Sequence, residues 1–87
     1  NMSAYTAAKA GVAALTQAVA EELVPHGIFV NAVAPSIMDT PANRRAMPDA
    51  DHSKWPSCDD VASTIAFLAS PANLSTRGGI VPVFGAA

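Results

Sequence analysis

Basic residues are scarce in the sequence, and this shortage limits the partners that the chain can have. Only five of its 87 residues are Lys or Arg, and the formal net charge is −2. A nucleic-acid-binding surface needs a basic stripe that neutralises phosphate groups. We therefore expect no nucleic-acid partner.

Long apolar runs are also missing. Glu21, Glu22 and Pro25 interrupt the longest apolar stretch before it reaches the roughly 20 residues that a membrane span needs. Residues 1–3 show neither the basic region nor the leucine-rich region of a secretory signal. We therefore expect a soluble protein that has no membrane partner.

Cysteine is nearly absent. Cys58 is the single cysteine, so no disulfide can form within the chain. The Cys and His residues also lack the spacing of a zinc site, and no metal is expected. Proteins without disulfides are typical of reducing compartments, so the sequence favours a cytoplasmic location.

Apolar residues, in contrast, make up 51% of the chain. In residues 4–24 their spacing, with Leu15 and Leu23 on one face, predicts a helix. Ser3 is the expected N-cap, and Pro25 is the expected stop signal. Because small residues occur on nearly every side, we expect this helix to be buried on more than one face.

The rest of the chain alternates between strands, turns and a second helix. Ser57 and Asp60 form a capping-box pattern, which marks the start of that helix. Pro82 removes a backbone donor from the last apolar run, which indicates an edge strand. The expected elements, in order, are a strand at 28–34, a loop at 35–56 with a short helix near 42–47, a helix that ends at 70 and a strand at 80–84.

The order helix, strand, helix, strand predicts an α/β fold. A strand, a crossover helix and a second strand form a right-handed βαβ unit, and its parallel sheet must be covered on both faces. Two strands and two helices are too few for this. The sequence therefore predicts that residues 1–87 are the C-terminal segment of a Rossmann-like domain with a doubly wound parallel sheet, whose N-terminal half is absent.

Tyr5 and Lys9 stand one helical turn apart in the stretch SAYTAAKAG. Residues with this spacing are neighbours on one face of a helix. A lysine ammonium stabilises the phenolate form of a nearby tyrosine, and the pair then makes a usable general acid and base. The same spacing arises by chance in many helices, so a packed tyrosine beside a solvated lysine is the alternative.

Further motifs follow this pair in a fixed order: IFVNAVAPS, IMDTP, DDVASTIAFLAS and GGIVPVFG. Together with Tyr5-x-x-x-Lys9 they resemble the C-terminal half of the short-chain dehydrogenase/reductase family, over essentially the whole chain. Residues 39–55 resemble the loop of dihydropteridine-reductase-like members. Two positions depart from the family pattern, because Ser36 replaces a usual Gly and Phe84-Gly85-Ala86 replaces Asp-Gly-Gly.

The resemblance implies an NAD- or NADP-dependent oxidoreductase. It assigns Tyr5 as the catalytic proton relay, and Lys9 as both the residue that tunes Tyr5 and a ligand of the nicotinamide ribose. It also implies that Pro35, Met38 and Thr40 contact the nicotinamide end of the cofactor. For Thr40, a loop hydroxyl that satisfies only the backbone is the alternative.

The implied reaction is hydride transfer between nicotinamide and a small-molecule substrate that is a carbonyl, an alcohol or pteridine-like. The family's Gly-rich turn and its catalytic Ser and Asn are expected upstream of Asn1, so this chain alone is expected to be inactive. The family's habit of associating through the Tyr/Lys helix implies a homo-dimer or homo-tetramer of the full-length protein. The alternative is a non-catalytic fragment or diverged member that serves only in fold assembly or oligomerisation.

Overall fold

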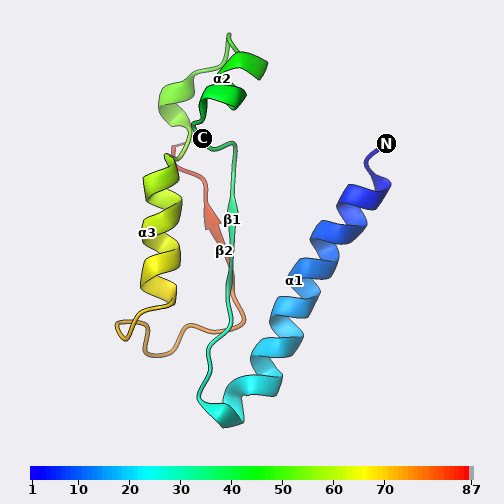
Figure 1. Cartoon of the computed structure of the whole chain (residues 1–87), viewed down its shortest axis with the longest axis vertical. Coiled ribbons are helices and arrows are strands. Elements are labelled where there is room, and N and C mark those ends of the chain that lie inside the picture. The colour runs from blue at the N-terminus through cyan, green and yellow to red at the C-terminus, as the bar shows by residue number, and fades with distance from the viewer. Residues whose placement is uncertain (87) are drawn as a thin grey trace. The chain divides into compact units, whose positions relative to one another are not determined.

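The computed structural model describes residues 1–86, which form two compact units (Figure 1). Unit 1 consists of residues 1–32 and 74–80, and unit 2 consists of residues 33–73 and the chain from Val81 onward. Each unit is therefore built from segments that are far apart in the sequence.

Unit 1 contains the long helix α1, Ser3–Leu23, followed by the short 3-10 helix η1, Val24–His26. The expected helix is therefore present, but Ser3 is its first residue and not its N-cap. Met2 occupies the cap position and makes no side-chain hydrogen bond there. Gly27 ends η1 with a φ of 69° and donates its amide to the carbonyl of Val24, because glycine adopts this left-handed geometry without a Cβ penalty.

The surface of α1 is largely open. Thr16 and Ala20 are its buried residues, whereas Val12 and Leu15 are 57% and 63% exposed. Residues 74–80 approach the C-terminal half of the helix, where Arg77 pairs with Glu21 at 2.6 Å. The expected burial on more than one face is thus not found within unit 1, since this segment covers only part of the helix.

The expected strand at 28–34 begins later than its apolar pattern suggests. Asn31 donates its side-chain amide to the carbonyl of Thr76 at 2.9 Å and accepts from the amide of Gly79 at 3.0 Å. These contacts satisfy backbone groups that a strand ladder would otherwise use. The strand β1 is consequently limited to Ala32–Pro35.

β1 pairs with the strand β2, Ile80–Val83 (Figure 1). The amide of Ala32 donates to the carbonyl of Gly79, and the amide of Ser36 donates to that of Val83. The later residue of β1 thus pairs with the later residue of β2, so the two strands are parallel, as expected. The fold class predicted from the sequence is therefore confirmed.

Unit 2 also holds the helix α3, Cys58–Leu68, between the two strands in sequence. The Ser57 hydroxyl accepts from the amide of Asp60, and the Asp60 carboxylate accepts from the amide of Ser57. This is the capping box that the sequence indicated. The helix buries Val61 and ends at Leu68, before the expected residue 70.

Within residues 1–86, no helix combines the length and the apolar character that a membrane crossing requires. The same residues contain no cluster of three or more His, Cys, Asp or Glu side chains placed to hold a metal ion.

Candidate functional site

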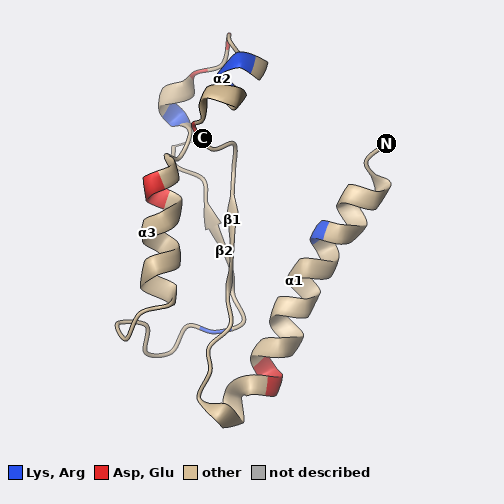
Figure 2. Cartoon of the chain, viewed as in Figure 1, with Lys and Arg blue, Asp and Glu red and all other residues tan. Residues whose placement is uncertain are grey.

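Tyr5 and Lys9 lie on one face of α1, as their spacing indicated. The Lys9 Nζ atom is 5.5 Å from the centroid of the Tyr5 ring. Lys9 is the only basic residue of α1, and its acidic residues, Glu21 and Glu22, lie near the other end of the helix (Figure 2). Tyr5 is 56% exposed in this chain.

The ammonium of Lys9 faces the ring of Tyr5 and forms no ion pair with any of the residues 1–86. A cation within about 6 Å of an aromatic ring is attracted to its face. The cation and the ring therefore attract one another on this face of α1.

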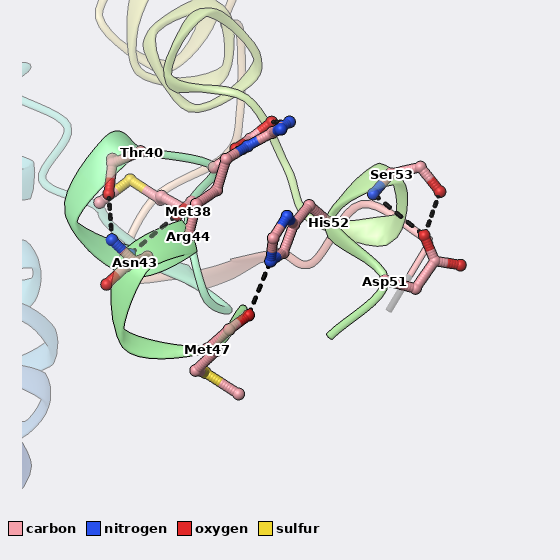
Figure 3. Close-up of polar contacts among 9 residues, drawn as sticks. Met38, Thr40, Asn43, Arg44, Met47, Asp51, His52 and Ser53 are labelled. Carbon is pink, nitrogen blue, oxygen red and sulfur yellow. Dashed lines mark hydrogen bonds and ion pairs between the residues drawn. The ribbon is translucent and has the colours of Figure 1, made fainter. Parts of the chain in front are cut away.

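Thr40 follows β1 in unit 2 and is the N-cap of the short helix α2, Pro41–Ala46. Its Oγ1 atom accepts from the amide of Asn43 at 3.1 Å, and the side chain of Asn43 donates to the carbonyl of Met38 at 2.8 Å (Figure 3). Asn43 thus fixes both Met38 and Thr40. Asn43 could not be identified from the sequence pattern, because its contacts depend on the turn that begins at Pro41.

The Thr40 hydroxyl has a defined polarity. Its oxygen is used as an acceptor by the cap, so its hydrogen is left to donate to an external oxygen. The carboxamide and phosphate groups of a nicotinamide cofactor carry such oxygens. The donor chemistry of Thr40 therefore fits that cofactor, and capping α2 does not exclude a second role.

Pro35 is the last residue of β1, and the Ser36 that replaces the family's usual Gly follows it. The Ser36 amide donates to the carbonyl of Val83 at 3.2 Å, and the Ser36 hydroxyl donates to the carbonyl of Phe84 at 3.1 Å. The extra hydroxyl thus ties the end of β1 to the residue that follows β2. Its observed role is structural.

Asp39 forms a two-point ion pair with Arg44. The Arg44 Nε atom donates to Oδ1 at 2.6 Å, and Nη2 donates to Oδ2 at 2.9 Å. These hydrogen bonds are the main cause that lowers the pKa of the Asp39 carboxyl below its usual value. The carboxylate is therefore charged at neutral pH, and the pair weakens only as the pH falls through that lowered value.

The end of the loop is held by a second set of contacts, around the short 3-10 helix η2, His52–Lys54. The His52 Nε2 atom lies 2.7 Å from the carbonyl oxygen of Met47 (Figure 3). The centroid of the His52 ring lies 4.6 Å from that of the Trp55 ring. His52 is half-buried and makes the contact with Met47 through its ring nitrogen. Its partners come from residues on both sides, which the sequence pattern did not reveal.

The C-terminal turn packs closely on the same segment. Gly85 has a φ of 64°, and a Cβ added there would lie 2.8 Å from the Lys54 carbonyl oxygen and 2.9 Å from the Pro56 nitrogen. The amide of Ala86 donates to the Lys54 carbonyl at 3.0 Å. Only glycine fits this contact without displacing backbone atoms.

The geometry therefore comprises a tyrosine and lysine on one helix in unit 1, and a capped turn after a parallel strand in unit 2. A family profile described as enoyl-(acyl carrier protein) reductase matches residues 1–85. The galactitol 2-dehydrogenase of Rhizobium johnstonii is 41% identical over 91 residues, which cover 93% of this chain and 35% of that protein.

Solved structures give the same result. The NADPH-bound short chain oxidoreductase of Pseudomonas aeruginosa PAO1 has a TM-score of 0.81 at 28% identity, covering 98% of this chain and 38% of that one. The 3-ketoacyl-(acyl-carrier-protein) reductase of Brucella melitensis, complexed with NADH, has a TM-score of 0.77 at 34% identity, covering 93% of this chain and 35% of that one.

These likenesses define a Rossmann-like α/β protein. The chain belongs to the short-chain dehydrogenase/reductase family. It spans little more than a third of the length of the relatives that it matches, with 35% of the Rhizobium enzyme covered.

Proposed function

We propose that the full-length protein, expressed from its complete reading frame, is an NAD(P)-dependent oxidoreductase that interconverts a carbonyl and an alcohol. The observation that carries this proposal is the placement of the Lys9 ammonium 5.5 Å from the Tyr5 ring on one helix. The NADPH-bound and NADH-bound structures of similar proteins support the choice of cofactor.

Tyr5 is the proton relay in the proposed reaction. A bound nicotinamide supplies or accepts the hydride. In the reducing direction, the Tyr5 hydroxyl gives its proton to the substrate oxygen as that oxygen gains negative charge, and Tyr5 becomes a phenolate. In the oxidising direction the phenolate takes the proton from the alcohol. Lys9 stabilises the phenolate and donates to a ribose hydroxyl of the cofactor.

Pro35, Met38 and Thr40 have a binding role in this proposal. Thr40 donates its hydroxyl hydrogen to an oxygen of the cofactor, while Pro35 and Met38 contact the nicotinamide ring. The polarity of the capped hydroxyl supports the role of Thr40. The hydrogen bond from Asn43 to the Met38 carbonyl supports the role of Met38, because it restrains the conformation of the segment that would contact the ring.

We also propose that the full-length protein forms a homo-dimer or homo-tetramer through α1. The exposed Val12 and Leu15 side chains support this, because large apolar side chains gathered on one helix are favourable to bury. The substrate is proposed to be a small carbonyl or alcohol, with a pteridine-like ring as a further candidate.

The proposed activity can be tested in two stages on the full-length protein. Calorimetry with NADH and with NADPH is expected to show specific binding of one of them. Loss of the reduced-nicotinamide absorbance is then followed with ketoses, 3-ketoacyl thioesters and a quinonoid dihydropterin. A folded full-length protein that binds neither cofactor would contradict the proposal.

The role of Thr40 gives a separate prediction. Thr40→Ser keeps the cap and the donor, so cofactor affinity is expected to change little. Thr40→Asp keeps the cap, has no hydrogen to donate at neutral pH and adds a negative charge beside an anionic cofactor, so it is expected to weaken binding by about tenfold or more. Titration of the cofactor into each variant measures this. Equal affinities for the Ser and Asp variants would show that Thr40 only caps α2.

A further inference from the structure

The Asp39–Arg44 ion pair closes a short loop of residues 39–44, here called the ring, which contains Thr40. Asp39 directly precedes Thr40, and Arg44 belongs to the helix that Thr40 caps. Inside this ring, the Thr40 Oγ1 atom accepts from the amide of Asn43. The direction of the Thr40 hydroxyl therefore depends on how α2 is oriented against the residue before it.

Asp39 is itself held in place by backbone contacts with the residues before α3. The amide of Asp39 donates to the carbonyl of Pro56 at 2.9 Å, and Asp39 forms an isolated parallel bridge with Ser57. Asp39 thus holds the start of the loop to the residues that begin α3. Its carboxylate extends this anchor to α2 through the two bonds to Arg44.

α2 needs such an anchor because it is only six residues long, and helices shorter than about 12 residues are marginal in water. The Arg44 guanidinium makes a planar two-point contact with the carboxylate, which restrains rotation as well as distance. The Asn43 contacts with Thr40 and Met38 hold the start of α2, and the Arg44 contact adds a restraint one residue further along the helix. The pair therefore limits the directions in which the Thr40 hydroxyl can point.

Arg45 provides an internal comparison. It follows Arg44 on the same helix and is exposed, but it makes no ion pair among the residues that the structure describes. The sequence presents the two arginines as an equivalent pair. The structure separates them, since Arg44 alone is bonded to Asp39.

We propose that Asp39 and Arg44 are a positioning pair, which orients the Thr40 hydroxyl toward the nicotinamide cofactor without touching the cofactor. This inference rests on the proposed function. It assigns to Arg44 a role in cofactor affinity, and it leaves Arg45 with none.

The test compares Arg44→Gln with Arg45→Gln in the full-length protein. Both variants lose one positive charge from the same helix, so general electrostatic effects on an anionic cofactor are matched. Calorimetry with the preferred nicotinamide cofactor is expected to show binding weakened about threefold to tenfold by Arg44→Gln and unchanged by Arg45→Gln. Arg44→Lys keeps the charge without the two-point contact, and an intermediate loss is expected.

Two further measurements separate positioning from general stability. The thermal midpoint of Arg44→Gln is expected to stay close to that of Arg45→Gln, because the pair is solvent-exposed. In a double-mutant cycle, Asp39→Asn combined with Arg44→Gln is expected to weaken binding no more than either change alone. Thr40→Ala combined with Arg44→Gln is likewise expected to add little to Thr40→Ala.

The outcomes are distinct. Equal cofactor affinities for Arg44→Gln and Arg45→Gln, in a protein whose unsubstituted form binds the cofactor, would overturn the positioning role and leave the proposed function intact. An affinity loss matched by a fall in thermal midpoint would also overturn it. Failure of the unsubstituted full-length protein to bind either cofactor would remove the proposed function, and this inference with it.

Discussion

Tyr5→Phe in the full-length protein is expected to lower turnover by about 10²-fold or more, with cofactor affinity nearly unchanged. The substitution removes the hydroxyl that is proposed to exchange the proton and keeps the ring that Lys9 faces. Positioned general acids and bases typically contribute 10²-fold to 10⁴-fold to rate. Steady-state kinetics with the preferred substrate, together with calorimetry for the cofactor, measure the two quantities separately.

Lys9 provides the companion variants. Lys9→Met removes the ammonium and is expected to lower both turnover and cofactor affinity, because the same group is proposed to stabilise the phenolate and to donate to the ribose. Lys9→Arg keeps a cation on the same face and is expected to retain more of both. If a well-folded Tyr5→Phe protein turned over at a near-normal rate across the pH range, Tyr5 would be only a packed aromatic residue.

The helices could be predicted from the sequence because their signals are local. α3 is preceded by Ser57 and contains Asp60 at the spacing of a capping box, and both hydrogen bonds are present. α1 follows from its apolar spacing and its many alanines. Errors in these elements are limited to their ends, as at Ser3.

The start of β1 could not be predicted because it depends on distant residues. Asn31 bonds to Thr76 and Gly79, which lie far along the chain. The apolar pattern at 28–34 contains no information about these partners. The strand β1 therefore begins at Ala32, later than the start at residue 28 that the apolar pattern predicts.

In the candidate site, too, local spacing could be predicted from the sequence, whereas contacts that depend on a turn could not. The spacing of Tyr5 and Lys9 sufficed to place them on one helical face, and the contact is observed. The Asp39–Arg44 pair and the cap on Thr40 require the turn at Pro41, which brings side chains from opposite sides of the turn together. A single sequence shows these residues only as charged and polar members of a loop.

Gly85→Ala is expected to be the most destabilising of three otherwise identical glycine substitutions. At Gly85 the new Cβ meets the Lys54 carbonyl oxygen at 2.8 Å and the Pro56 nitrogen at 2.9 Å, and the φ of 64° adds strain. Both neighbours are backbone atoms, so no side chain can move aside. A loss of roughly 2–4 kcal/mol in the free energy of unfolding is expected from the two effects together.

Gly27 and Gly11 separate these effects. Gly27 has a φ of 69° but no atom within 4 Å of an added Cβ, so Gly27→Ala tests backbone strain alone and is expected to cost about 1 kcal/mol. Gly11 lies inside α1 with a helical backbone. Gly11→Ala is expected to stabilise the protein by about 0.5–1 kcal/mol through the higher helix propensity of alanine alone.

Urea unfolding of the three variants in the full-length protein gives the order directly. The expected order of stability is Gly11→Ala, then the unsubstituted protein, then Gly27→Ala, and last Gly85→Ala. A Gly85→Ala protein as stable as Gly27→Ala would mean that the C-terminal turn does not rest on residues 54–56 in solution. Because those residues end the loop that begins beside Thr40, Gly85→Ala is also expected to weaken cofactor binding, whereas Gly27→Ala is not.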